Sequence, residues 1–192
     1  MIKKKKTTEK ETLERKEEIK IAKFTINFIG GSASSEDKEA KELYEQSRFG
    51  ESKDGKILYS LVEVLYLLEK DKIEVMGDNK KLNIKEFTKK AVKYEPNFLV
   101  RYVVFKDMRS RGYIVKTALK FGADFRVYDR GIKPGEDHAK WILYPVREGE
   151  TMTWYEFSAK NRVAHSTRKR LLVAVADEEN EVTYYEIAWT RP

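Results

Sequence analysis

The sequence contains no cysteine and only two histidines, His138 and His165. Without cysteine the chain cannot form disulfides, thiolate zinc sites or iron–sulfur clusters, and it has no thiol nucleophile. Gly30-Gly31 is too short for a dinucleotide-binding or P-loop pattern. No apolar run approaches the roughly 20 residues that span a bilayer, and the lysine-rich start lacks the apolar core of a signal peptide. We therefore expect no metal, no cofactor and no membrane association, and a cytoplasmic protein.

The composition is that of a globular protein with one large domain or two small ones. The chain has 192 residues, of which 41% are hydrophobic and 37% charged. Lysine and arginine total 39 against 32 acidic residues, a net charge of +7. This excess favours a polyanionic partner such as nucleic acid, although interleaved charges are equally typical of an ordinary solvated surface.

The first half divides into a charged tail and a small domain. Residues 1–18 contain too few apolar side chains for a core, and we expect either disorder or a solvated helix. Residues 19–96 contain alternating and helical apolar patterns, and we place a domain boundary near Pro96. The predicted elements are a strand at 21–29 ended by Gly30-Gly31-Ser32, a Glu/Lys-rich helix or loop, a helix from the capping box Ser60-Leu61-Val62-Glu63, a strand at 73–76 and a helix at 84–94.

The second half, residues 97–192, is rich in predicted strands. A helix at 98–111 ends before Gly112, and a second helix covers about 153–166. Five strands are expected, at 113–119, 123–128, 139–146, 171–176 and 181–188. The stretch 171–176 is apolar without alternation, which predicts a strand covered on both faces at the centre of the sheet. The chain is thus α+β: a small N-terminal α/β domain plus a C-terminal mixed-sheet domain with flanking helices.

Candidate catalytic residues cluster around one predicted hairpin. Tyr128 shares the polar face of its strand with Arg126, and a Gly- and Pro-containing loop separates it from His138. If the flanking strands pair, Tyr128 and His138 lie near each other at the hairpin mouth. A surface histidine in a chain with eleven tyrosines also needs no function. The basic cluster Arg168-Lys169-Arg170 suits phosphate binding or simple solvation. His165, alone on a helix, is more typical of a structural or phosphate-facing role than of a catalytic one.

These residue types are sufficient for cleaving RNA without metal. The 2′-hydroxyl of the substrate supplies the nucleophile, so the protein adds only acid–base catalysis and charge stabilisation. Tyrosine, histidine and lysine can supply these functions. The same residues can also merely bind RNA.

Three segments, 109–117, 121–128 and 162–170, closely resemble the archaeal tRNA-splicing endonuclease family in sequence and order. Segments 58–67 and 73–75 resemble its first half, whereas residues 1–18 have no counterpart. The resemblance implies a nuclease that cuts introns from precursor tRNA at bulge-helix-bulge sites. It also implies 2′,3′-cyclic phosphate and 5′-hydroxyl ends and no metal requirement.

The resemblance assigns catalytic roles to Tyr128 as general base, His138 as general acid and Lys169 as transition-state stabiliser. Free tyrosine has a pKa of about 10, so cationic neighbours such as Lys169 would have to favour the phenolate. A non-catalytic RNA-binding or structural subunit is the alternative, although such a subunit would be expected to have lost at least one of the three residues. A metal-dependent nuclease is a weaker third choice.

Further family positions concern RNA binding and assembly. Arg162 and Trp189 resemble residues that clamp a bulge base, although Trp189 also fits an edge-strand core aromatic, and Arg168 of the basic cluster is a further RNA-binding candidate. The acidic turn Asp177-Glu178-Glu179 resembles a loop that enters a basic pocket of another subunit, although a solvated turn is the plain alternative. The resemblance implies a homotetramer, or the catalytic half of a heterotetramer with a structural subunit.

Overall fold

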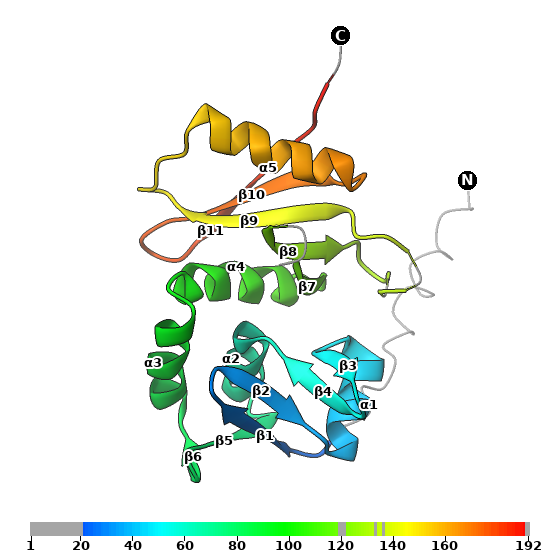
Figure 1. The fold of residues 1–192 in the computed structure, drawn as a ribbon, viewed down its shortest axis with the longest axis vertical. Coiled ribbons are helices and arrows are strands. Elements are labelled where there is room, and N and C mark those ends of the chain that lie inside the picture. Colours follow the sequence, from blue (N-terminus) through cyan, green and yellow to red (C-terminus); the bar gives the residue numbers. More distant parts are fainter. Residues whose placement is uncertain (1–20, 119–121, 133, 136, 191–192) are drawn as a thin grey trace, which may run out of the picture.

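The computed structural model describes residues 21–118, 122–132, 134–135 and 137–190. The predicted tail, residues 1–18, lies outside the described residues. Two β-sheets lie one above the other, each formed by one half of the chain, and helix α4 (Phe98–Ser110) lies between them (Figure 1). The mixture of five helices and two mixed sheets in the described residues confirms the predicted α+β class.

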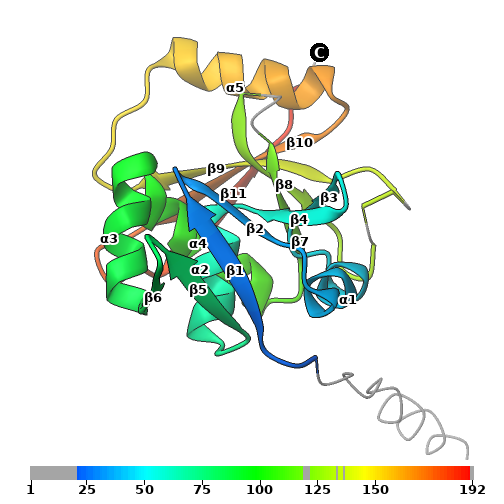
Figure 2. The ribbon, with the colours of Figure 1, turned by 60° about the horizontal axis from the view of Figure 1, so that its bottom comes forward.

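The first sheet has the strand order β3-β4-β2-β1-β5-β6, in which β1 and β5 are parallel and the other neighbours antiparallel. Helix α1 lies beside β3 and β4, and α3 lies beside β6 (Figure 2). The elements of this half are β1 (Phe24–Ile29), β2 (Ser32–Ser35), α1 (Lys38–Ser47), β3 (Glu51–Lys53), β4 (Lys56–Tyr59), α2 (Leu61–Glu69), β5 (Ile73–Gly77), β6 (Lys80–Leu82) and α3 (Ile84–Tyr94).

Two-residue turns with positive φ build three hairpins in this sheet. Gly30 and Gly31 have φ values of 57° and 82° and join β1 to β2, whose ends pair as Ile29 with Ser32. Turns of this kind match the twist of antiparallel strands. Strand β2 therefore lies between β1 and α1. We expected the Glu/Lys-rich helix or loop to follow the first strand and its glycine turn without another strand between them. Its sequence Ser-Ala-Ser-Ser lacks the β-branched and aromatic residues that mark strands, so pairing with β1 and β4 sets its conformation.

The predicted capping box starts α2. The Glu63 carboxylate accepts hydrogen bonds from the Ser60 backbone N–H at 2.9 Å and from the Ser60 hydroxyl at 2.8 Å. The same carboxylate accepts from the Gly50 N–H at 2.9 Å, which ties the helix start to the segment before β3. Glu63 is buried, and both of its carboxylate oxygens accept hydrogen bonds.

The second sheet has the order β11-β10-β9-β8-β7, in which β9 and β10 are parallel and the other neighbours antiparallel. Helix α5 makes the crossover between β9 and β10 and covers the face opposite α4 (Figure 1). The further elements are β7 (Ile114–Ala118), β8 (Ala123–Tyr128), β9 (Trp141–Arg147), α5 (Trp154–Ser166), β10 (Arg170–Ala176) and β11 (Val182–Ile187).

Strand β10 lies inside the sheet, but the middle strand is β9. Leu171 faces the cluster under α5 and Leu172 the cluster under α4, so β10 is covered on both faces as predicted. The predicted position at the centre of the sheet is wrong: among the described residues one strand, β11, lies beyond β10, whereas β7 and β8 extend the sheet beyond β9. An apolar run indicates burial and does not specify the strand order.

One hydrophobic core runs through both halves of the chain. Phe105 of α4 contacts Tyr66 of α2 edge-on, with ring centroids 5.8 Å apart, and Phe125 of β8 at 6.0 Å. Each of these residues belongs to, or packs against, the same buried cluster. Helix α4 therefore joins the first half of the chain to the sheet that carries the candidate site.

Candidate active site

A pocket of about 360 Å³ opens where the loop between β8 and β9 meets the turn between α5 and β10. All three predicted catalytic residues line it. The lining residues are Arg126, Tyr128, Gly135, Asp137, His138, Ala139 and Lys169.

Tyr128 is the last residue of β8 and is 5% exposed. Its position is set by pairing with Ile114 of β7. Burial raises the pKa of Tyr128 and outweighs the Arg126 charge, which lowers it, while the Glu51 charge raises it further. The phenol therefore carries its proton at neutral pH, and the pKa of the side chain is not lowered below its ordinary value.

His138 lies in the loop that joins β8 to β9, and its side chain is exposed. The loop is closed two residues later by a hydrogen bond of 2.9 Å from the Lys140 N–H to the Val127 carbonyl. Lys140 also pairs with Asp129 at the other end of the loop, at 3.2 Å. These contacts bring His138 back to the end of the strand that carries Tyr128.

Lys169 enters the pocket from the turn that ends α5. The Arg168 N–H donates to the His165 carbonyl and the Lys169 N–H to the Ala164 carbonyl, at 2.9 and 2.8 Å. This is the Schellman pattern of helix ends. The Arg170 N–H then donates to the Lys140 carbonyl at 3.0 Å, which sets Lys169 beside the start of β9. Burial lowers the pKa of Lys169, and so does the Arg126 charge.

Arg126 and Asp137 are pocket residues to which sequence reasoning gave no role. The signal for Arg126 was present, since it lies two residues before Tyr128 on the same face of a strand. Asp137 precedes His138 in the loop and accepts a hydrogen bond from the His138 N–H at 2.6 Å. No strand or helix periodicity extends into this loop, so its side-chain directions could not be predicted.

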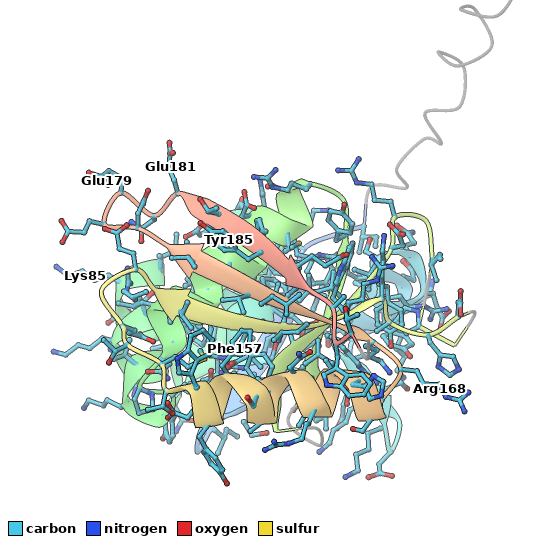
Figure 3. All side chains as sticks on the ribbon, turned by 90° about the horizontal axis from the view of Figure 1, so that it is seen from above. Lys85, Phe157, Arg168, Glu179, Glu181 and Tyr185 are labelled. Carbon is cyan, nitrogen blue, oxygen red and sulfur yellow. The ribbon has the colours of Figure 1, made fainter. Side chains whose placement is uncertain are left out.

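The predicted RNA-binding residues lie outside this pocket. Arg162 is an exposed residue of α5, and Arg168 is exposed at the end of α5 (Figure 3). Trp189 follows β11, is 49% exposed, and lies 4.4 Å from His165 between ring centroids. The interpretation of Trp189 as a core aromatic residue on an edge strand is thus wrong, because about half of the residue is exposed to solvent.

The acidic turn lies at the other end of β10 from Lys169. The Asp177 carboxylate accepts the Glu181 N–H at 2.8 Å and closes the turn. Glu179 and Arg168 lie at opposite ends of the molecule (Figure 3). The turn therefore does not contribute to the pocket of its own chain.

Two family models match the sequence, one for each half. Residues 26–88 match the tRNA intron endonuclease, N-terminal domain, and residues 98–184 match the tRNA intron endonuclease, catalytic C-terminal domain. The chain belongs to the tRNA-intron endonuclease family. It is therefore an enzyme that acts on tRNA.

Curated relatives cover most of the chain. A tRNA-splicing endonuclease of Nanoarchaeum equitans is 49% identical over 138 residues, which is 69% of this chain and 88% of the relative. One from Thermococcus onnurineus is 42% identical over 167 residues, covering 86% and 96%. One from Methanothermobacter thermautotrophicus is 38% identical over 153 residues, covering 80% and 89%. None of the helices in the described part of the chain has the length and apolar composition that a membrane span requires.

Proposed function

We propose that this endonuclease cuts precursor tRNA at bulge-helix-bulge intron boundaries and leaves 2′,3′-cyclic phosphate and 5′-hydroxyl ends without a metal. The observation that carries the proposal is the convergence of Tyr128, His138 and Lys169 on one pocket from two separate segments of chain. These residues supply a proton acceptor, a proton donor and a cation, which is what transfer of a phosphoryl group to an internal hydroxyl requires.

The proposed reaction has one phosphoryl transfer and two proton transfers. The reaction starts from the fraction of enzyme in which Tyr128 has released its proton to solvent, because burial keeps the phenol protonated in the rest. The substrate 2′-oxygen attacks the phosphorus while its proton passes to this phenolate. The bond from phosphorus to the 5′-oxygen breaks, and His138 donates a proton to that oxygen. The Lys169 ammonium offsets the charge that develops on the phosphate oxygens.

The test is to incubate the purified chain in excess chelator with a precursor tRNA that contains a bulge-helix-bulge, and to analyse the fragment ends. Cyclic phosphate and 5′-hydroxyl ends are expected. Cleavage that stops in chelator and returns with a divalent cation would contradict metal independence. Binding without cleavage, with or without added metal, would leave either a missing partner subunit or the non-catalytic RNA-binding subunit, and co-purification of a second chain would separate the two.

Contacts with the RNA are proposed to extend from the pocket along α5. Arg168 would contact phosphate, while Arg162 and Trp189 would hold a bulge base by cation–π and stacking contacts. Trp189 has one side against His165 and remains 49% exposed, so aromatic surface is available for a base.

Arg168→Gly is expected to stabilise the fold and weaken RNA binding. Arg168 has φ +56°, whereas the equivalent position after α4 is Gly112 with φ +87°. A non-glycine residue at positive φ costs about 1 to 2 kcal/mol, part of which is offset by the greater freedom of glycine in the unfolded chain. We expect about 0.5 to 1 kcal/mol of added stability in denaturant titrations, with a higher Kd for precursor tRNA.

Arg168→Ala is the matched control for this prediction. Alanine removes the charge but keeps the positive φ, so binding should weaken with no gain in stability. Unchanged RNA affinity in both variants would show that Arg168 does not contact phosphate. Equal stability of the glycine and alanine variants would contradict the backbone argument.

The acidic turn is proposed to mediate assembly into a homotetramer, or a heterotetramer with a structural subunit. Replacing Asp177, Glu178 and Glu179 by lysine should then reduce the mass measured by light scattering to that of a smaller oligomer. The basic pocket of the other subunit would be left without its charge complement. Loss of the Asp177 contact with the Glu181 N–H should loosen the turn itself, while the sheet that it joins should persist. An unchanged oligomer mass would contradict this role, and the triple replacement Glu36→Lys, Glu39→Lys and Glu42→Lys near α1 provides a charge-matched control.

A further inference from the structure

Arg126 lies in the catalytic pocket with donor groups that the described residues leave largely unused. Arg126 lines this pocket together with Tyr128, His138 and Lys169. The Nε atom is buried and has no hydrogen-bond partner in the described part of the chain. A buried donor without an acceptor costs free energy, so such a group is expected to have a partner in the working complex.

The ion pair that Arg126 does form is weak. Its Nη2 atom lies 3.5 Å from the Glu51 carboxylate of β3, and the Glu51 side chain is 57% exposed. Solvent screens a pair at this distance and exposure, so the pair contributes little. A phosphodiester can replace this carboxylate, because its two non-bridging oxygens also match the planar donor fork of a guanidinium.

The Arg126 charge also acts on two of the residues to which we assign chemistry. It lowers the pKa of Tyr128, against the larger effect of burial, and it lowers the pKa of Lys169. The guanidinium is thus close enough to influence the proton acceptor and the lysine together. A cation at this position favours the phenolate that the reaction needs.

We infer that Arg126 is a further catalytic residue, whose guanidinium leaves Glu51 and donates to a non-bridging oxygen of the scissile phosphate. The inference rests on the proposed function, since it names a group acting in the same pocket on the same phosphate. Arg126 then stabilises the developing charge from the strand side while Lys169 does so from the helix end. It also keeps a positive charge beside the Tyr128 oxygen as the 2′-proton is transferred.

Single-turnover cleavage of a synthetic bulge-helix-bulge RNA tests this assignment. Arg126→Gln should lower the rate at saturating enzyme about 100- to 1,000-fold, as for loss of one preorganised donor in other active sites. Arg111→Gln removes an arginine whose charge pairs with Asp107 on α4, and should leave the rate unchanged. Glu51→Gln should raise cleavage at subsaturating enzyme by up to about fivefold, because the competing carboxylate is gone.

A sulfur substitution at the scissile phosphate separates direct contact from a structural effect. Replacing the contacted non-bridging oxygen by sulfur should slow the wild-type enzyme about tenfold or more, because a charge-assisted hydrogen bond is weakened. In Arg126→Gln the same substitution should have little effect. Arg126→Lys should recover part of the rate, since the charge remains without the fork geometry.

The outcomes distinguish the inference from the proposed function. If the wild-type enzyme cleaves the RNA and Arg126→Gln cleaves equally fast, Arg126 is not catalytic and the proposed function stands. If both enzymes show the same sulfur effect, the guanidinium does not contact the phosphate. If the wild-type enzyme does not cleave, either alone or with a co-purified structural subunit, the proposed function fails and the inference fails with it. Should Arg126→Gln lose its circular dichroism spectrum, Glu51→Gln and Arg126→Lys provide the same test in folded protein.

Discussion

Replacing His138 by alanine is expected to abolish most cleavage while leaving substrate binding intact. A positioned general acid contributes about 100- to 10,000-fold to rate. His138 is exposed, and the contacts that close its loop come from backbone atoms and from Lys140, so the variant should fold normally. The measurements are single-turnover cleavage of end-labelled precursor tRNA and the Kd for an RNA with a 2′-deoxy nucleotide at the cleavage site, which cannot react.

A leaving group that needs no proton sharpens this prediction. When sulfur replaces the 5′-oxygen, the leaving thiolate departs unprotonated, so His138→Ala should cleave that substrate at a rate close to the wild-type rate. A slow reaction of the variant with the sulfur substrate would contradict the role of His138 as acid. The other histidine gives the control: His165 contacts Trp189 and lies outside the pocket lining, so His165→Ala should affect binding more than rate.

Replacing Glu63 by glutamine is expected to destabilise the fold by about 3 to 5 kcal/mol, because it leaves a buried lysine without its counter-ion. Lys116 of β7 reaches into the first half of the chain, where its Nζ lies 3.6 Å from Glu63, and the two side chains are 5% and 7% exposed. Lys116 also donates to the Gly50 carbonyl, and Glu63 accepts from the Gly50 N–H. Thermal or denaturant unfolding measures the loss.

Two further variants test the cause. Glu69→Gln, in the same helix, removes the partner of the half-exposed Lys106 and should cost less than about 1 kcal/mol. Glu63→Gln combined with Lys116→Met removes both charges and should recover the part of the loss that comes from the unpaired lysine. The part that comes from the glutamine NH2 facing the N–H of Gly50 or Ser60 should remain. A double variant as unstable as Glu63→Gln alone would show that the buried charge is not the cause.

The destabilisation by Glu63→Gln should decrease as pH rises. Burial already lowers the pKa of Lys116, against the Glu63 charge, which raises it. Without the Glu63 charge, the pKa of Lys116 in the folded variant falls further below its unfolded value of 10.5. At pH values between these two pKa values, the unfolded chain binds more protons than the folded chain. Stability of the variant therefore increases with pH up to about 10.5. A constant difference from the wild type at pH 7 and pH 9.5 would contradict this assignment.

The sequence predicts elements best where one periodic pattern continues for several turns. Residues 84–94 form a helix over the predicted range, and the capping box at Ser60 marks the start of α2. Strands β3 and β6 were missed because each has three residues and is rich in lysine, serine or glutamate. The turns that join these strands to their partners are easier to recognise from the sequence. Asp54-Gly55 and Asp78-Asn79 are residue pairs typical of two-residue hairpin turns, and all four residues have positive φ.

Sequence spacing brought Tyr128 and His138 together through one hairpin, but Lys169 joined them only through the family resemblance. Its place depends on the parallel pairing of β9 and β10, which neither strand specifies alone. The protonation of Tyr128 was beyond sequence reasoning as well, because its pKa depends on burial by tertiary contacts. The cation found to lower the pKa of the phenol is Arg126, where we expected Lys169.

Helix α4 packs against α2 and against the second sheet, so dividing the chain beside this helix would separate the two parts of one hydrophobic core. A cut at Pro96 would fall between α3 and α4, in the short connection between the matched segments. Each fragment would then expose apolar surface that Phe105 and its ring contacts now cover, and such surface drives aggregation. Fragments produced separately should precipitate, whereas fragments produced in the same cell should recombine into one folded unit. The pocket lies wholly on the second fragment, but its reconstitution would require the first.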